Sequence, residues 1–219
     1  MTEIFTGSFT QQEPLPPAAI AAANTVMQSG RLHRYNLVEG EAGEASLLEA
    51  EFAAFTGAAH CVALASGGQA MAIALRATGV THATPVLTNA FTLAPVPGAV
   101  AAVGGTPVFV GTTEALTIDL DDLTAKIKTT NARHLLLSHM RGHIADMDAL
   151  MAICDGAGVT VIEDCAHTMG ADWNGTASGR HGAMACYSTQ TYKHINSGEG
   201  GLLTTDDPDL AAKAILMSG

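Results

Sequence analysis

Three short segments of this 219-residue chain carry side chains that could do chemistry. The first is Ser66-Gly67-Gly68-Gln69, a glycine turn that joins an apolar run ending at Ala65 to a helical pattern. Glycines let the backbone approach a ligand closely, and the N–H groups of a helix's first turn attract phosphate and other anions. A tight turn between a strand and a helix explains the glycines equally well. The segment matches neither GxGxxG nor a P-loop, so it does not favour a nucleotide.

The second segment places two acids directly after an apolar run. Val161-Ile162 is followed by Glu163 and Asp164, and His167 comes three residues after Asp164. If the run is a buried strand of an open parallel sheet, at least one carboxylate lies at the rim of the sheet, where ligands bind. Two ordinary alternatives stay open. Asp164 would cap the N-terminus of a helix, and His167 would be a hydrogen-bonded core residue.

The third segment is a polar, glycine-rich loop between two apolar runs, and it contains Lys193. An amine that is partly withdrawn from water is nucleophilic at neutral pH and forms Schiff bases with carbonyl compounds. The ordinary alternative is a solvated loop lysine. Together the three segments supply a phosphate cradle, an acid and an amine nucleophile, the groups that pyridoxal phosphate (PLP) requires of its protein.

The elements that must position these segments are short apolar strands that alternate with helices. Strand and helix in turn predict βαβ units and a sheet with helices on both faces. We therefore predict an α/β three-layer sandwich around a seven-stranded, mostly parallel sheet. The helical stretches between strands are Gln69–Thr78, Asp119–Lys128 and Asp146–Cys154, and the seven predicted strands are Cys61–Ala65, Pro85–Thr88, Pro107–Val110, His134–Ser138, Thr160–Glu163, Met184–Ser188 and Gly201–Thr205.

The first sixty residues have a different pattern. Two helices are predicted, at about Ala18–Gln28 and Ala45–Phe55, with no strand between them. We predict a helical N-terminal arm over residues 1–57 and a ligand-binding domain over residues 58–219. The arm would pack on the sheet domain or on a second subunit.

Composition excludes several classes of partner. Ten Lys and Arg residues against 21 Asp and Glu residues give a net charge of −11, and no basic run is present. These features argue against nucleic acid and against an anionic membrane surface. The chain lacks an uninterrupted run of about 20 apolar residues that a spanning helix needs. The four cysteines are far apart and form no CxxC pair, so we expect buried thiols and a cytoplasmic location.

Several longer stretches contain these segments: SGGQAMAIAL at 66–75, GGTPVFV at 104–110, ADMDALMAIC at 145–154, VIEDCAHTMGA at 161–171 and YSTQTYKHINSGEGG at 187–201. Across them, from about residue 15 to 219, the chain resembles the PLP-dependent sugar aminotransferases of the DegT/DnrJ/StrS type, a family of fold type I. The family spaces its acid, its partner for the ring oxygen O3′, its phosphate serine and its lysine as Asp, +3, +24 and +29. These positions are Asp164, His167, Ser188 and Lys193 here.

The resemblance implies a role for each of these residues. Lys193 would form the Schiff base and act as general acid and base, and Asp164 would keep the ring nitrogen protonated. His167 would hydrogen-bond O3′. The reaction implied is transfer of an amino group from glutamate or glutamine to a keto sugar or keto cyclitol. The phosphate would be held by Ser188 and by backbone N–H groups around Gly67, Gly68 and Gln69.

The chain also departs from the family pattern. His167 stands where many members have glutamine, and Leu93 stands where an aromatic residue usually stacks on the cofactor ring, so either Leu93 or Phe91 would contact the ring. Arg141 and His139, after an apolar run, are candidates to bind a substrate carboxylate or phosphate. His139 and His143 have metal-like spacing, but no third ligand is evident, and we predict no metal site.

Alternatives to transamination stay open. One is another PLP reaction on the same scaffold, such as that of a dehydratase or lyase. The dehydratase branch of the family has histidine in place of the Schiff-base lysine. In this chain the lysine is present as Lys193, and His194 follows it. A catalytically incomplete PLP-binding subunit or fragment is the other. Family members continue into a smaller C-terminal domain that this chain lacks. The resemblance therefore implies either a fragment of a longer enzyme or a second chain that supplies this domain, and we expect a homodimer.

Overall fold

The computed structural model describes residues 6–8, 14–35 and 38–219, which fall into two units, 1–43 and 44–219. The described part of the smaller unit contains helix α1 (Pro17–Ser29). Proline at the start of α1 fits a first turn whose N–H groups have no intrahelical acceptor. Gly30, at φ 71°, ends the helix in the left-handed conformation that glycine adopts readily.

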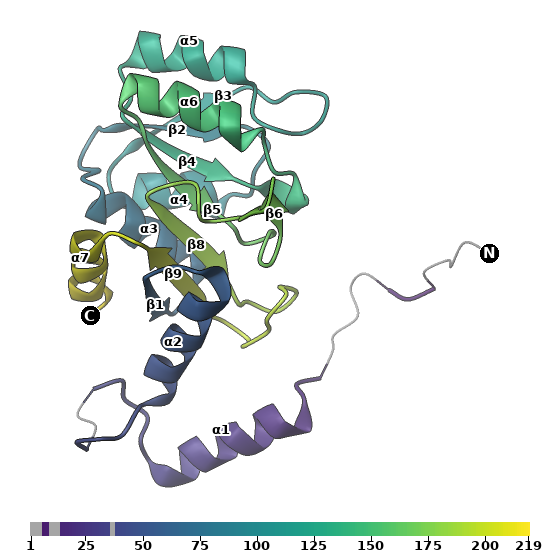
Figure 1. The fold of residues 1–219 in the computed structure, drawn as a ribbon, viewed down its shortest axis with the longest axis vertical. Helices are drawn as coiled ribbons and strands as arrows, with labels where there is room; N and C mark the ends of the chain where they lie inside the picture. The colour runs from purple at the N-terminus through teal and green to yellow at the C-terminus, as the bar shows by residue number, and fades with distance from the viewer. Residues whose placement is uncertain (1–5, 9–13, 36–37) are drawn as a thin grey trace. The chain divides into compact units, whose positions relative to one another are not determined.

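The larger unit is built on one seven-stranded sheet in the order β1-β9-β8-β5-β4-β2-β3 (Figure 1). Neighbouring strands are parallel from β8 to β3, whereas β9 runs antiparallel to both β8 and β1. The predicted mostly parallel sheet is confirmed. The strands are β1 (His60–Leu64), β2 (Pro85–Asn89), β3 (Thr106–Val110), β4 (His134–Ser138), β5 (Thr160–Asp164), β8 (Met184–Ser188) and β9 (Gly201–Thr205).

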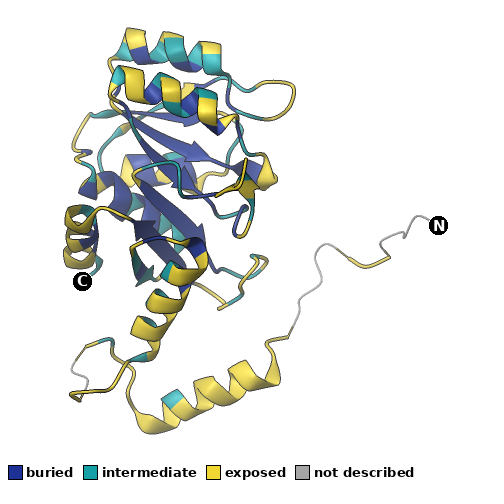
Figure 2. Ribbon diagram, in the orientation of Figure 1, coloured by how far each residue is buried: buried dark blue, intermediate teal, exposed yellow. Residues whose placement is uncertain are grey.

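Helices cover both faces of the sheet, which gives the three predicted layers. On one face, α3 (Gly67–Ala77), α4 (Pro95–Ala102) and α7 (Pro208–Ser218) pack over a core that includes Leu75, Val100 and Ile162. On the other face, α5 (Leu120–Thr130) and α6 (Met147–Ala157) pack over a core that includes Leu123 and Leu150. Figure 2 shows the buried strands between helices whose outer surfaces are exposed.

Acidic and hydroxyl side chains cap the N-termini of four helices of this unit. The side chain of Ser66 accepts a hydrogen bond from the backbone N–H of Gln69 at the start of α3. Asp119, Asp146 and Asp207 cap α5, α6 and α7 in the same way. Each such cap is worth about 1 kcal/mol, because it satisfies an N–H group that has no intrahelical acceptor.

Helix α2 (Glu44–Thr56) belongs to the larger unit. Phe52 of α2 is buried and packs edge-on against the ring of Tyr187, with 5.0 Å between ring centroids. The division of the chain at Gly43 and Glu44 therefore differs from the predicted boundary at residue 57. The sequence pattern predicts no strand before residue 58, but it does not show which surface the helix at 44–56 packs against.

One helix and one short hairpin were not predicted from the sequence. Helix α4 contains Pro95, Pro97 and Gly98, which read as breakers, yet both prolines lie in the first turn, where the missing N–H costs nothing. A short hairpin, β6 (Asp172–Trp173) and β7 (Thr176–Ala177), follows β5. Within the described part of the chain, no helix is long and apolar enough to cross a membrane.

Candidate functional site

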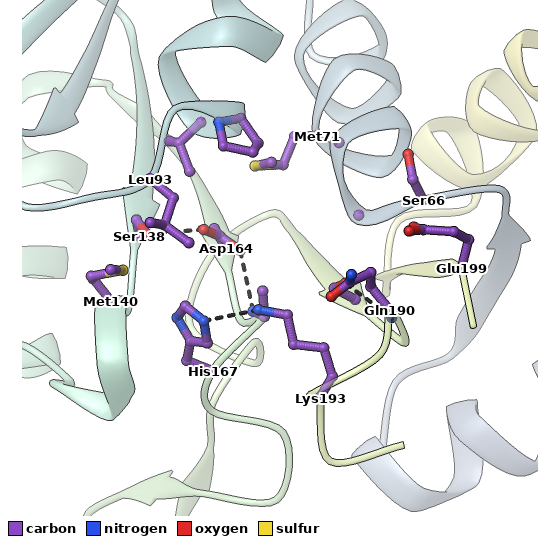
Figure 3. A pocket seen from close by; sticks show the side chains of 16 residues that line it. Ser66, Met71, Leu93, Ser138, Met140, Asp164, His167, Gln190, Lys193 and Glu199 are labelled. Carbon is purple, nitrogen blue, oxygen red and sulfur yellow. Dashed lines mark hydrogen bonds between the residues drawn. The ribbon is translucent and has the colours of Figure 1, made fainter. Parts of the chain in front are cut away.

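A cavity of about 420 Å³ lies at the carboxyl ends of β4, β5 and β8, beside the first turn of α3. This is the edge at which open α/β sheets bind ligands. The residues that line the cavity come from segments far apart in the sequence (Figure 3). They include most of the residues predicted for the cofactor: Gly67, Gly68, Leu93, Asp164, His167, Ser188 and Lys193.

Asp164 is the last residue of β5, and its carboxylate is held by two donors. Ser138 Oγ donates to Asp164 Oδ2 at 2.9 Å, and the backbone N–H of Ala166 donates to Oδ1 at 3.1 Å. The Asp164 side chain lines the cavity and is 8% exposed. Its role is therefore not helix capping. It presents a fixed negative charge to whatever occupies the cavity.

Lys193 and His167 meet in the cavity, with 2.8 Å between Lys193 Nζ and His167 Nε2 (Figure 3). The other ring nitrogen of His167, Nδ1, accepts a hydrogen bond of 3.2 Å from the backbone N–H of Arg141. Burial lowers the pKa of Lys193, against the opposing effect of the Asp164 charge. Burial, together with the nearby Lys193 charge, also lowers the pKa of His167. Lys193 is therefore a half-buried amine with a hydrogen-bonded partner, and not the solvated loop lysine of the ordinary alternative.

The glycine turn and Ser188 form one wall of the cavity. A Cβ atom on Gly67 would lie 3.0 Å from Ser188 Cβ and 3.3 Å from the carbonyl oxygen of Tyr187. A side chain here would force Ser188 or the start of α3 to shift by a few tenths of an ångström, so glycine favours this close approach. Gly67 and Gly68 are in the first turn of α3, where backbone N–H groups have no intrahelical acceptor.

Gln69 does not have the environment predicted for it. Its backbone N–H donates to Ser66 Oγ at 3.0 Å, and its side-chain Oε1 accepts from the N–H of Ala65 at 2.9 Å. It is absent from the lining of the cavity. The prediction that the Gln69 N–H is free to hold a phosphate is wrong, because the N-cap of α3 already uses it.

The structure distinguishes between the two candidates for contact with a ring. Leu93 lines the cavity, whereas Phe91 does not. The ring of Phe91 instead approaches His143, with 6.5 Å between ring centroids. The aliphatic side chain of Leu93 is therefore the one available to a planar ligand.

The structure places His139 and Arg141 outside the cavity lining. His139 is 1% exposed, and its Nε2 lies 3.0 Å from Oε2 of the fully buried Glu163. The prediction that His139 binds substrate is wrong, because its ring points into the interior to pair with this carboxylate. Arg141 has an exposed side chain and a left-handed backbone (φ 57°). The Arg141 backbone N–H donates to His167 Nδ1. Its positive charge, from outside the cavity lining, helps to lower the pKa of His167 and of Lys193.

Glu163 anchors the loop that follows the β6–β7 hairpin. Its two carboxylate oxygens accept hydrogen bonds from the backbone N–H groups of Gly179, His181 and Gly182, in addition to the His139 contact. Burial raises the pKa of Glu163, but these hydrogen bonds outweigh the effect and hold its pKa below the ordinary value. The second acid after β5 is therefore structural.

Glu163, His139 and Cys165 bring ligand-type atoms within 4.8 Å of one another. All three residues are buried, and the carboxylate is already saturated with hydrogen bonds. Burial also raises the pKa of Cys165 well above that of an ordinary thiol. Hydrogen bonds already engage all three residues, because His139 contacts Glu163 and Cys165 Sγ accepts from Ser178 Oγ at 3.3 Å. His143, the other histidine of the predicted pair, is not a member.

With this geometry established, comparison with known proteins gives the family. A model of the DegT/DnrJ/EryC1/StrS aminotransferase family matches residues 17–219. The chain belongs to this family. Members of the DegT/DnrJ/EryC1/StrS family are PLP-dependent aminotransferases, which confirms the resemblance and the cofactor class that the sequence motifs indicate.

Relatives within the family include two curated proteins and a solved structure. The pleiotropic regulatory protein of Geobacillus stearothermophilus is 35% identical over 93% of this chain and 53% of its own length. The L-glutamine:scyllo-inosose aminotransferase of Streptomyces griseus is 34% identical over 90% of this chain and 46% of its own. The structure of an aminotransferase from Psychrobacter cryohalolentis superimposes with a TM-score of 0.85 at 27% identity, over 95% of this chain and 52% of that one. The chain spans about half the length of these relatives.

Sequence reasoning missed two residues that organise this family member's site. Ser138 supports Asp164, and Asn89, the last residue of β2, binds the backbone of Ser138 through both ends of its amide. Asn89 Nδ2 also donates to the carbonyl oxygen of Phe91 at 2.9 Å. Both are polar residues at the carboxyl ends of parallel strands. Ligands bind at the carboxyl ends of the strands in open parallel sheets, so polar residues at the end of every strand are candidates, and these include Asn89 and Ser138.

Proposed function

We propose that this chain is the cofactor-binding part of a PLP-dependent aminotransferase that transfers an amino group from glutamine or glutamate to a keto sugar or keto cyclitol. The observation that carries the proposal is the meeting of Lys193, Asp164 and the first turn of α3 in one cavity. An amine, a carboxylate and an anion-binding helix start match the aldehyde, ring nitrogen and phosphate of this cofactor.

The residues present fit the cofactor. Gly67 leaves room for the helix start to approach Ser188, so a phosphate would meet N–H groups of Gly67 and Gly68 together with the Ser188 hydroxyl. The carboxylate of Asp164 is fixed by two donors and has a partly exposed edge, which suits a protonated pyridine nitrogen. When bound, the cofactor supplies an electron-withdrawing ring that stabilises negative charge on the amino carbon of a substrate.

The roles of the chain's own residues follow from this placement. Asp164 would hold the proton on the ring nitrogen, because its negative charge favours the protonated ring. Lys193 Nζ would take the proton from the amino carbon of the donor and return one to the acceptor, as a half-buried amine with a lowered pKa can do near neutral pH. Leu93 would cover one face of the ring.

The choice of substrates draws on a relative. The enzyme of Streptomyces griseus is named for L-glutamine and scyllo-inosose, a donor amide and a keto cyclitol. Its 34% identity with this chain supports glutamine as amino donor and a cyclic ketone as acceptor. We also place the protein in the reducing cytoplasm, since all four of its cysteines are free thiols. The homodimer and the second chain supplying a C-terminal domain stay predictions.

The first test is the site of covalent attachment. The full chain is incubated with PLP, reduced with borohydride and digested, and mass spectrometry is expected to find the pyridoxyl group on Lys193. A matched control replaces Lys128, an exposed lysine of α5, by alanine and keeps the label. A label spread over surface lysines, or one that persists in Lys193→Ala, overturns the proposal.

The second test is amino transfer itself. Glutamine labelled with ¹⁵N on its α-amino group is supplied with a panel of keto sugars and keto cyclitols, and ¹⁵N is expected in an amino product. A chain that binds PLP on Lys193 but never converts it to the amine form with glutamine or glutamate would be the catalytically incomplete alternative. Release of water or cleavage of a carbon–carbon bond without amino transfer would indicate the dehydratase or lyase alternative.

A further inference from the structure

His167 lies between a backbone donor and the Lys193 amine. Its Nδ1 accepts from the N–H of Arg141 at 3.2 Å, and its Nε2 lies 2.8 Å from Lys193 Nζ (Figure 3). The two contacts use opposite sides of one ring. Because a neutral imidazole carries one proton, the protonation of one ring nitrogen determines that of the other.

The Arg141 N–H determines the protonation of the ring. A backbone N–H can only donate, so the Nδ1 that it contacts must be without a proton. A neutral imidazole carries one proton, which must then be on Nε2. The hydrogen bond between the ring and Lys193 therefore runs from Nε2–H to Nζ. A protonated lysine has three donors and no acceptor, so it cannot receive this bond.

We propose that His167 holds Lys193 as a neutral amine: the Arg141 backbone N–H fixes the Nε2–H tautomer of His167, and that N–H donates to the lone pair of Lys193 Nζ. His167 is thus a positioning residue for Lys193 as well as the predicted partner of the cofactor oxygen. The alternative arrangements each break a bond. A charged lysine would need a proton on Nδ1 facing the Arg141 N–H, and a charged histidine would put the same proton there.

The charges around the pair favour the same state on balance. Burial lowers the pKa of both Lys193 and His167, and the Arg141 cation acts in the same direction on each. His194 also opposes a charge on His167, whereas the carboxylate of Asp164 favours a charge on either group. Glu199 lines the same cavity. Asp164 is the group that opposes the proposal, and the hydrogen-bond pattern indicates that it does not prevail.

The neutral state of Lys193 does not depend on the proposed function; only its use in catalysis rests on that function. An ordinary lysine at neutral pH has about one molecule in 2,500 in the neutral, nucleophilic form, as its pKa of about 10.4 requires. A lysine held neutral before a carbonyl compound arrives reacts without first losing a proton to solvent.

The first test reads the tautomer directly. Nitrogen-15 NMR of the cofactor-free full chain, with its histidines labelled, is expected to show His167 at pH 7 with a bare Nδ1 and a protonated Nε2. A His167→Gln sample assigns the signal. A proton on Nδ1, or on both nitrogens, at pH 7 would overturn the proposal. This measurement requires no cofactor and no reaction, and the variant serves only to assign the signal.

The second test reads the lysine. Lys193 and the exposed Lys128 are labelled in competition with trinitrobenzenesulfonate across a range of pH, and each is quantified by mass spectrometry. Lys193 is expected to react at a lower pH than Lys128. In His167→Phe, which keeps an aromatic ring but has no ring nitrogen, the rate at Lys193 at pH 7 is expected to fall by about tenfold or more, one unit of pKa. An unchanged rate would mean that burial alone accounts for the reactivity.

A matched control separates the hydrogen bond from the neighbouring charge. Arg141→Asn removes the cation but keeps the backbone N–H, and asparagine tolerates the left-handed backbone at this position. Lys193 is expected to stay much more reactive in this variant than in His167→Phe. Loss of reactivity in Arg141→Asn alone would assign the effect to the arginine charge. If the tautomer and reactivity are as expected but no amino transfer occurs, the proposed function fails and this inference stands.

Discussion

Ser138 and Asp164 are register partners on β4 and β5, and the hydroxyl of one donates to the carboxylate of the other at 2.9 Å. The bond joins the last residues of two adjacent parallel strands at the rim of the sheet. Asn89, at the end of β2, fixes the Ser138 backbone from the other side with hydrogen bonds of 2.9 and 3.0 Å. Three neighbouring strand ends therefore act together to orient one carboxylate.

Replacing Ser138 by alanine should leave Asp164 Oδ2 without its side-chain donor. Loss of a hydrogen bond to a charged group of this kind costs about 1–3 kcal/mol. We expect a lower free energy of unfolding in urea and weaker PLP binding, measured by absorbance titration. The control is Ser178→Ala, a buried serine that bonds Thr168 away from the cavity. It should lower stability without changing PLP affinity, and equal affinities in all three proteins would contradict the role assigned to Ser138.

Two glycine-to-alanine changes in helices should have different effects: Gly67→Ala should weaken PLP binding, and Gly98→Ala should raise the free energy of unfolding. In Gly67→Ala the added Cβ would meet Ser188 Cβ at 3.0 Å, so the start of α3 must move and PLP affinity should fall. In Gly98→Ala, within α4, no atom lies within 4 Å of the added Cβ. This variant should gain about 0.5–1 kcal/mol of stability from helix propensity. Urea unfolding and PLP titration measure both effects, and tight PLP binding by Gly67→Ala would exclude the close approach as a requirement.

Glu163 should make stability depend on acid pH. Its pKa is held below the ordinary 4.5, mainly because the hydrogen bonds from His139 and the loop N–H groups outweigh the cost of burial. The unfolded chain therefore binds more protons than the folded chain as pH falls through this range. The contribution is present above the unfolded pKa of about 4.5 and is lost as pH falls through the lower folded value.

Glu163→Gln tests this contribution. It removes the charge and leaves a buried amide facing backbone donors, which should cost about 3–5 kcal/mol and flatten the acid side of the stability curve. Glu51→Gln, an exposed position on α2, should change stability by less than about 0.5 kcal/mol. Unfolding by urea at a series of pH values measures both. If the wild type and Glu163→Gln lose stability in parallel below pH 5, the carboxylate is not the cause.

An aromatic residue at position 93 should strengthen cofactor binding. Leu93 lines the cavity and is partly exposed, so Leu93→Phe would place a ring where a planar ligand binds. Offset stacking adds about 0.5–1.5 kcal/mol beyond area burial, or roughly a two- to twelvefold gain in affinity. Phe91→Leu, which changes a side chain outside the cavity, should leave affinity unchanged. Loss of affinity in Phe91→Leu would make Phe91 the stacking residue instead.

Much of the fold follows from local pattern. Each of the seven strands coincides with an apolar run bounded by turn residues. The central strands are buried on both faces and therefore require apolar side chains. The helix starts at Ser66, Asp119, Asp146 and Asp207 follow from capping chemistry. The resemblance to the family spacing singled out Asp164, His167, Ser188 and Lys193, which lie after or at the ends of two predicted strands.

What only the tertiary structure decided is which atoms those groups contact. The order β8-β5-β4-β2 puts Ser138 beside Asp164 and Asn89 beside Ser138, although 26 and 49 residues separate them. His139 faces the interior because Glu163, on the next strand, offers it a buried partner. Gln69 loses its N–H to the cap of its own helix. Sequence determines which groups reach the edge of the sheet. Hydrogen bonds depend on distance and direction between strands, so only the assembled sheet determines which of them face the cavity.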